Sequence, residues 1–194
     1  MQWSLMLFVN SVLLGVGLAM DAFSVSLATG LREPKMKLGR MNLIAGVFGG
    51  FQAVMPLIGW ICVHTHLTYF QAFEKCIPWI AMILLGFIGG KMLYEGIRKK
   101  GDDEAPTKMG LHELLIMGVA TSIDALSVGF TIAEYHVLTA LLAALIIGIV
   151  TYIICMAGLF LGKKFGMRFS SKAQILGGVI LIVLGVEIFV KMLR

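Results

Sequence analysis

Long apolar stretches with few charged residues, separated by short polar segments, dominate the chain. Six of them reach the length of about 20 residues that an α-helix needs to cross the hydrocarbon core of a bilayer. They lie at residues 5–31, 41–63, 77–97, 111–133, 137–161 and 173–193. The pattern therefore predicts an all-α integral membrane protein with six transmembrane helices and short connections.

Basic residues gather in every second connection. Of the 16 Lys and Arg residues, twelve lie in the segments 32–40, 98–108 and 163–172, and three lie in the segments on the other side. Because cytoplasmic loops carry an excess of Lys and Arg, these three segments are expected in the cytoplasm. Both termini are then expected outside.

Composition narrows the possible functions. The chain of 194 residues is 59% hydrophobic and 14% charged, so it leaves no room for a separate soluble catalytic domain. The net charge of +5 does not indicate a nucleic-acid partner, because no stacking aromatics accompany the basic residues. The expected surroundings are a lipid bilayer. The three cysteines show no metal-binding or disulfide spacing.

A carboxylate interrupts two of the apolar stretches within the same short motif. Asp21 is the only charged residue between Trp3 and Leu31, and Asp124 follows it by 103 positions, each in the pattern Asp-Ala-x-Ser-Val. A charge near the centre of a bilayer costs about 2.5 to 3.5 kcal/mol even on mild insertion scales. Because each carboxylate carries this cost and both lie in the same motif, Asp21 and Asp124 are expected to take part in the function of the protein.

The motifs belong to a longer internal repeat. Matches at an offset of 99 are Gly49 with Gly148, Gly59 with Gly158, and Leu85-Gly86 with Leu184-Gly185. Because each copy holds three spans, an odd number, the second copy must lie upside down in the membrane relative to the first. The prediction is two inverted three-helix repeats, residues 1–97 and 111–194, joined by a polar cytoplasmic linker at 98–110.

Each aspartate shares a helix face with hydroxyl groups. Residues three apart lie on one face, so Asp21 is grouped with Ser24, and Asp124 with Ser127 and Thr121. Two carboxylates that approach one another repel unless a cation lies between them. Oxygen ligands of this kind suit Mg²⁺, Ca²⁺ or Mn²⁺, and no His lies in a predicted span.

The second span offers a further oxygen ligand. Pro56 cannot donate a hydrogen bond to the carbonyl four residues earlier, which is that of Gln52. Gln52 is therefore a candidate metal ligand through its side chain, and Thr151 is its counterpart at the offset of 99. Both are expected to line the transport path.

Two acidic residues near span ends have a simpler interpretation. Glu95 lies four residues after Lys91, and Glu187 lies four residues before Lys191, so both glutamates are expected in ion pairs near the membrane faces. Glu187 and Glu95 remain candidate residues of the path that an ion would take through the membrane. Glu187 would be a second acidic position on that path.

A metal site inside a protein that consists almost entirely of membrane spans favours a metal transporter, and three alternatives to it are open. The aspartates are a structural clamp between helices, the chain is a metal-dependent membrane enzyme, or it exports an amino acid or another cation. A clamp lacks a cationic partner in mid-span, and an enzyme lacks a mid-span base. No GxxxxGK[ST] run is present, so nucleotide-driven transport is not expected.

The chain resembles the MntP manganese-efflux pump family, within the superfamily of LysE-type exporters. The resemblance rests on residues 20–26, Phe51-Gln52, 55–60, 94–96, 120–125 and 175–178. It implies a bacterial inner-membrane exporter with Mn²⁺ as its transported substrate, no cofactor, and the paired aspartates at the transport site. Gln52 is a departure, since some family members carry an acid there, and Glu187 is the candidate to supply the missing charge.

Overall fold

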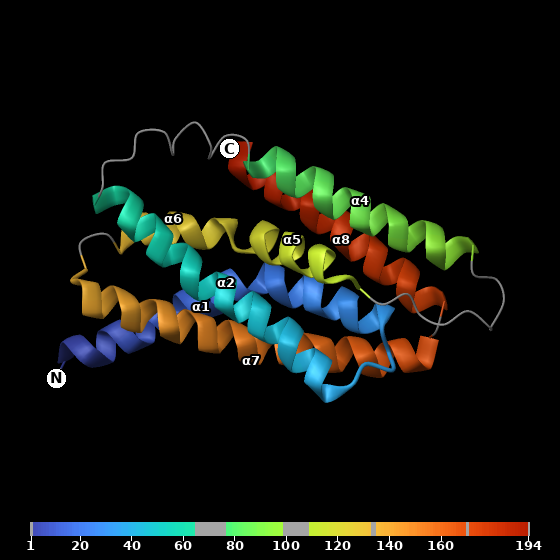
Figure 1. Ribbon diagram of the computed structural model, residues 1–194, viewed down its shortest axis with the longest axis horizontal. Coiled ribbons are helices and arrows are strands. Elements are labelled where there is room, and N and C mark those ends of the chain that lie inside the picture. Colours follow the sequence, from blue (N-terminus) through green and yellow to red (C-terminus); the bar gives the residue numbers. More distant parts are fainter. Residues whose placement is uncertain (1, 65–76, 99–108, 133–134, 170, 194) are drawn as a thin grey trace.

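The computed structural model describes residues 2–64, 77–98, 109–132, 135–169 and 171–193. All elements in these ranges are helices that run roughly along the long axis (Figure 1). They are α1 (Gln2–Arg32), α2 (Leu38–His64), α4 (Ile77–Arg98), α5 (Leu111–Thr121), α6 (Ile123–Thr131), α7 (Val137–Phe169) and α8 (Ser171–Leu193). The predicted linker at 98–110 falls mostly outside the described residues.

The helices α1, α2 and α7 are each long and apolar enough to cross a membrane. The bent pair α5 and α6 makes a fourth candidate span. The described part of the chain is therefore an all-helical membrane protein with three to four candidate spans.

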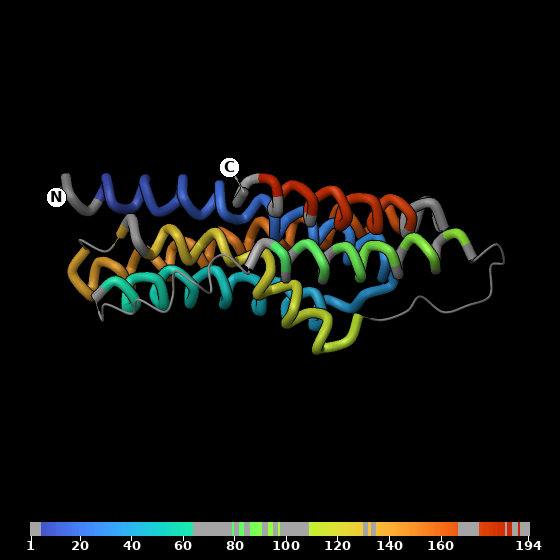
Figure 2. The backbone as a smooth tube through the Cα atoms, turned by 90° about the horizontal axis from the view of Figure 1, so that it is seen from above, coloured from blue at the N-terminus to red at the C-terminus, as the bar shows by residue number. Residues whose placement is uncertain are grey.

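The fourth predicted span is broken rather than continuous. The helix stops at Thr121 and resumes at Ile123 with a bend of 42°, so that α5 turns away from the line of α6 (Figure 2). The Thr121 hydroxyl donates to the Met117 carbonyl at 2.9 Å, and the Ser122 hydroxyl donates to the Gly118 carbonyl at 2.7 Å. These hydroxyls satisfy carbonyls at the helix end, which allows the backbone to bend there.

The fifth predicted span is longer than expected. It was expected to end at residue 161 before a basic loop, but α7 continues to Phe169 and carries Lys163, Lys164 and Arg168 on the helix. Lys and Arg are good helix formers. Lys163 also donates from Nζ to the Met36 carbonyl at 2.8 Å, which holds the extension against the segment between α1 and α2.

Helix pairs pack closely along their lengths. α1 packs along α7 and α4 along α8, while α2 contacts both α7 and α6 (Figure 1). Their shared core includes Met41, Phe48, Met117, Leu159 and Leu181, all buried. Other large apolar side chains, such as those of Leu145 and Ile153 on α7, are exposed, as expected for a surface that faces lipid.

Glycines allow backbones to touch where helices cross. A Cβ on Gly49 would lie 2.8 Å from the Gly148 carbonyl oxygen, and a Cβ on Gly148 would lie 2.9 Å from that of Gly49. Gly89 and Gly178 meet in the same way, at 2.8 and 2.7 Å. Small residues are the usual means of close packing between membrane helices. The second pair holds α4 against α8.

Candidate functional site

The Gln52 side chain contacts the backbone just ahead of each aspartate. Gln52 is fully buried on α2, and its Nε2 donates to the Leu18 carbonyl at 2.9 Å and to the Thr121 carbonyl at 3.3 Å. Leu18 lies three residues before Asp21, and Thr121 lies three residues before Asp124. One amide group thus contacts equivalent positions of both repeated motifs.

These two hydrogen bonds fix the orientation of the amide. Carbonyl oxygens only accept hydrogen bonds, so the nitrogen of Gln52 must face them and Oε1 must point elsewhere. Among the described residues, Gln52 Oε1 and Thr151 Oγ1 are both buried without a hydrogen-bond partner. A buried polar atom left in this way costs about 1–3 kcal/mol. Two oxygen atoms at repeat-related positions are therefore suited to a ligand.

Asp21 lies in the unbroken middle of α1 and is half-buried. Ser24, one turn later, donates its hydroxyl to the Met20 carbonyl at 3.1 Å. The proton of Ser24 is committed to the helix, while its oxygen keeps the capacity to accept or to coordinate. The predicted grouping of this carboxylate and hydroxyl on one helix is consistent with such a role.

Asp124 lies in the first turn of α6 and is exposed. Its Oδ1 accepts a hydrogen bond of 2.8 Å from the Ala125 amide. The N-terminus of a helix favours a negative charge, because its first amide groups point outward. Ser127, one turn later, is also exposed, so the predicted pair of oxygen groups is not covered by other described side chains.

The other candidate residues differ in their surroundings. The Thr121 hydroxyl is buried and bonded within α5, so Thr121 contributes its backbone carbonyl to the Gln52 contact instead. Glu187 is exposed on α8, and the side chain of Glu95 lies outside the described part. Among the described residues, no three or more His, Cys, Asp or Glu side chains are placed to hold a metal ion.

Sequence reasoning missed the two backbone acceptors of the site. Both acceptors are backbone carbonyls, those of Leu18 and Thr121, and no side-chain pattern in the sequence indicates them. The available clue was their spacing, since 18 and 121 differ by 103, as the two aspartates do.

Comparison with known proteins identifies the family. A family model described as "Mntp: Putative manganese efflux pump" matches residues 35–189. The chain belongs to the MntP family. MntP relatives include a "Putative manganese efflux pump MntP" of Clostridium perfringens, which is 38% identical over 96% of this chain and 95% of its own length. The relative from Crocosphaera subtropica is 40% identical over 94% of this chain and 95% of its own.

Membership of the MntP family excludes one of the alternatives. Its members are transporters, so the chain is a multi-pass membrane transporter and not an enzyme. No solved structure matches the chain.

Proposed function

We propose that this chain exports Mn²⁺ through a site between α1, α2 and the α5–α6 break. The observation that carries the proposal is the Gln52 amide, which binds one carbonyl ahead of each aspartate. Asp21 and Asp124 are the charged ligands, Ser24 and Ser127 add hydroxyl oxygens, and Gln52 adds Oε1. The relatives bear the name of manganese efflux pumps, and this donor set of hard oxygens suits Mn²⁺.

The break between α5 and α6 supports an ion site at this place. Discontinuous helices in transporters expose backbone carbonyls and helix ends near the middle of the membrane, where ions bind. Here the break lies two residues before Asp124, and Thr151 lies on the α7 helix that crosses α2. Thr121, Thr151, Glu95 and Glu187 are proposed as further residues of the path.

We propose six membrane-crossing helices in two inverted repeats, which adds α4 and α8 to the candidate spans. Matching backbone contacts support this arrangement. A Cβ on Gly59 would meet the Leu126 carbonyl, and a Cβ on Gly158 would lie 2.9 Å from the Phe23 carbonyl. These two contacts correspond at the offsets of 99 and 103. The excess of basic residues in three segments supports a topology with both termini outside, which we propose for a bacterial inner membrane.

Exchange for protons is the proposed driving force. Metal ligation requires ionised carboxylates, so protons and Mn²⁺ compete for Asp21 and Asp124. Protons that enter from outside would displace Mn²⁺ and return the carrier to its inward-facing state.

The test is Mn²⁺ flux in proteoliposomes. Asp21→Asn and Asp124→Asn keep the side-chain size, remove the charge and lower the cost of membrane insertion, so each variant is expected to insert normally and to lose transport. Asp102→Asn, in the predicted linker, is the matched control and should transport at the wild-type rate. Wild-type flux in either of the first two variants would contradict the proposed site, and loss of membrane protein in both would favour the structural clamp.

A further inference from the structure

A buried ion pair joins the end of α1 to the start of α5. Arg32 is 3% exposed, and its Nη1 lies 2.8 Å from Glu113 Oε1. Arg32 occupies the last turn of α1 and Glu113 the first turn of α5. Each charge therefore also complements the dipole of its own helix. The pair connects the ends of the two helices that lead to Asp21 and Asp124.

A second buried carboxylate lies beside this pair. Glu33 accepts from Arg40 through both oxygens, with distances of 2.7 Å to Nε and 2.8 Å to Nη2. Arg40 Nη2 also donates to the Met109 carbonyl at 2.6 Å, and the Met109 amide donates to Glu33. Two-point contacts of this kind between Arg and a carboxylate fix geometry as well as contributing energy.

The Arg32–Glu113 pair crosses between the two proposed repeats, since Arg32 belongs to the first and Glu113 to the second. The Glu33–Arg40 pair lies within the first repeat and ties it to Met109, in the predicted linker just before the second repeat. Both groups lie at the end of the molecule where the basic segments predict the cytoplasm. Any motion that parts the two repeats at this end must break the Arg32–Glu113 pair.

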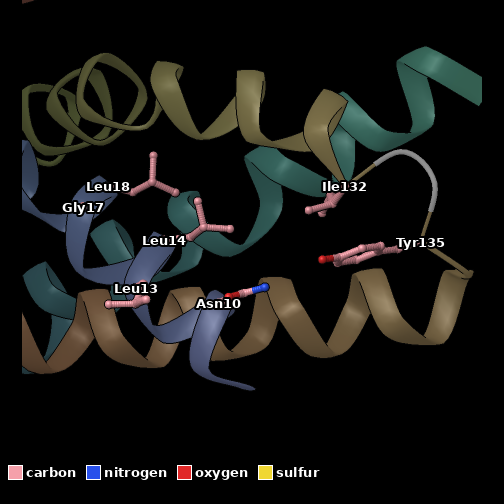
Figure 3. Close-up of a pocket in the computed structure, with 7 residues that line it drawn as sticks. All are labelled: Asn10, Leu13, Leu14, Gly17, Leu18, Ile132 and Tyr135. Carbon is pink, nitrogen blue, oxygen red and sulfur yellow. The ribbon is translucent and has the colours of Figure 1, made fainter. Parts of the chain in front are cut away.

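The opposite half of α1 borders an open cavity of about 560 Å³. The cavity lies between α1, the end of α6 and Tyr135, and the polar tips of Asn10 and Tyr135 face it (Figure 3). Trp60 Nε1 holds the Tyr135 carbonyl at 3.1 Å. Leu18 also lines the cavity, eight residues after Asn10 on α1, and the Leu18 carbonyl is one of the two acceptors of Gln52. The cavity thus extends from Asn10 to the level of the proposed site.

We propose that Arg32, Glu33, Arg40 and Glu113 form a charge lock, which closes the basic end of the transporter while the Asn10 and Tyr135 end is open. This inference rests on the proposed transport function, since a lock matters only if the two ends open in turn. The distance from Leu18 to Arg32 along α1 is about 21 Å, so the lock and the cavity lie on opposite sides of the proposed site.

The stability of the closed state depends on both partners of the ion pair, Arg32 and Glu113. Removing one partner of a buried pair leaves an uncompensated charge in a poorly solvated place. Arg32 Nε already lacks a hydrogen-bond partner among the described residues. Without Glu113, the charged Arg32 guanidinium is most stable in contact with water. Opening of this end brings water to it.

The experiment uses two cysteine reporters in the full chain with its three native cysteines replaced. Gly17→Cys reports on the cavity, because a Cβ at Gly17 has no atom within 4 Å. Met117→Cys reports on the region behind the lock, because Met117 is 1% exposed. Labelling with a membrane-impermeant thiol reagent is measured in vesicles of each orientation.

Glu113→Gln is expected to raise labelling of Met117→Cys about tenfold and to lower that of Gly17→Cys, since a shift between two states moves both reporters oppositely. His112→Gln, at the exposed neighbouring position, should change neither. Reversing the pair, with Arg32→Glu and Glu113→Arg together, should restore protection. Arg40→Gln provides a second variant of the lock if Glu113→Gln does not fold.

Unchanged labelling of both reporters in folded Glu113→Gln and Arg40→Gln would overturn the lock. Increased labelling of both reporters would also overturn it. That result would show that the ion pairs only stabilise the helix bundle as a whole. Labelling requires no Mn²⁺ transport, so a failure of the lock is distinct from a failure of the flux experiment.

Discussion

Gln52 Nε2 lies 3.3 Å from the carbonyl oxygen of Thr121, at the point where α5 ends. The same nitrogen lies 2.9 Å from the Leu18 carbonyl oxygen of α1. A single side chain of α2 therefore ties α1, which carries the first motif, to the end of α5 just before the second motif. It does so with its nitrogen, and its oxygen is buried without a hydrogen-bond partner among the described residues.

Two substitutions of Gln52 should distinguish the role of Nε2 as a hydrogen-bond donor from the proposed role of Oε1 as a metal ligand. Gln52→Leu removes the donor and the oxygen, and is expected to weaken Mn²⁺ binding about ten- to a hundredfold, as loss of groups that orient metal ligands does. Gln52→Glu keeps an oxygen and adds a charge, so binding should be retained above the Leu variant. Calorimetric titration of purified protein with Mn²⁺ measures both.

The control for Gln52 is Asn42→Ala on the same helix α2, which removes the exposed hydrogen bond of 3.0 Å from Tyr152 of α7 to Asn42. Its Mn²⁺ affinity should equal that of the wild type. Equal affinities for Gln52→Leu and the wild type would remove Gln52 from the site.

Proton release should accompany Mn²⁺ binding. Both carboxylates must be ionised to bind the metal, so affinity is expected to fall as the pH falls, through a titration that belongs to the coupled pair. Calorimetry in buffers of different protonation enthalpy gives the number of protons released per Mn²⁺. A value near zero across the acidic range would exclude proton antiport while leaving the metal site in place.

Adjacent glycines of α2 should respond differently to the same substitution. Gly49→Ala places a Cβ 2.8 Å from the Gly148 carbonyl oxygen, and overpacking of this kind costs about 1–3 kcal/mol. Gly50→Ala meets no atom within 4 Å, so its melting temperature in detergent should equal or exceed that of the wild type. Similar melting temperatures for the two variants would show that α2 and α7 do not touch at Gly49.

The direction of the chain in the membrane follows from its basic residues. Cysteines at two exposed positions, Lys35→Cys and His136→Cys, test it with an impermeant thiol reagent. Reagent outside intact cells should label His136→Cys and should not reach Lys35→Cys until the membrane is permeabilised. The reverse pattern would invert the topology, and the cavity would then open to the cytoplasm.

Helix positions were predictable because an apolar stretch of span length has few alternatives to a helix in a membrane. All six predicted stretches coincide with a described helix or helix pair. The end of α7 was not predictable, since the rule that assigns Lys163 and Arg168 to the cytoplasmic side does not decide between helix and loop. Contact with Met36 across the sequence decides it.

The two aspartates could be identified from the sequence because a charge within an apolar stretch is unusual. The contacts around them could not be predicted in this way. The Gln52 contacts use backbone carbonyls, which every residue possesses. The pairing of Arg32 with Glu113 joins residues 81 positions apart, and in the sequence they look like ordinary charges in a loop and at the start of a span. Their burial, rather than their identity, makes them notable.

The bend at Ser122 makes the two repeats mechanically unequal. Thr121 and Ser122 have hydroxyls that satisfy the carbonyls of the bend. The corresponding positions of α1, Leu18 and Ala19, have none, and α1 is continuous from Gln2 to Arg32. One half therefore provides a stiff rod and the other a joint, so that in the proposed site Asp124 would move with the joint while Asp21 stays fixed on the rod.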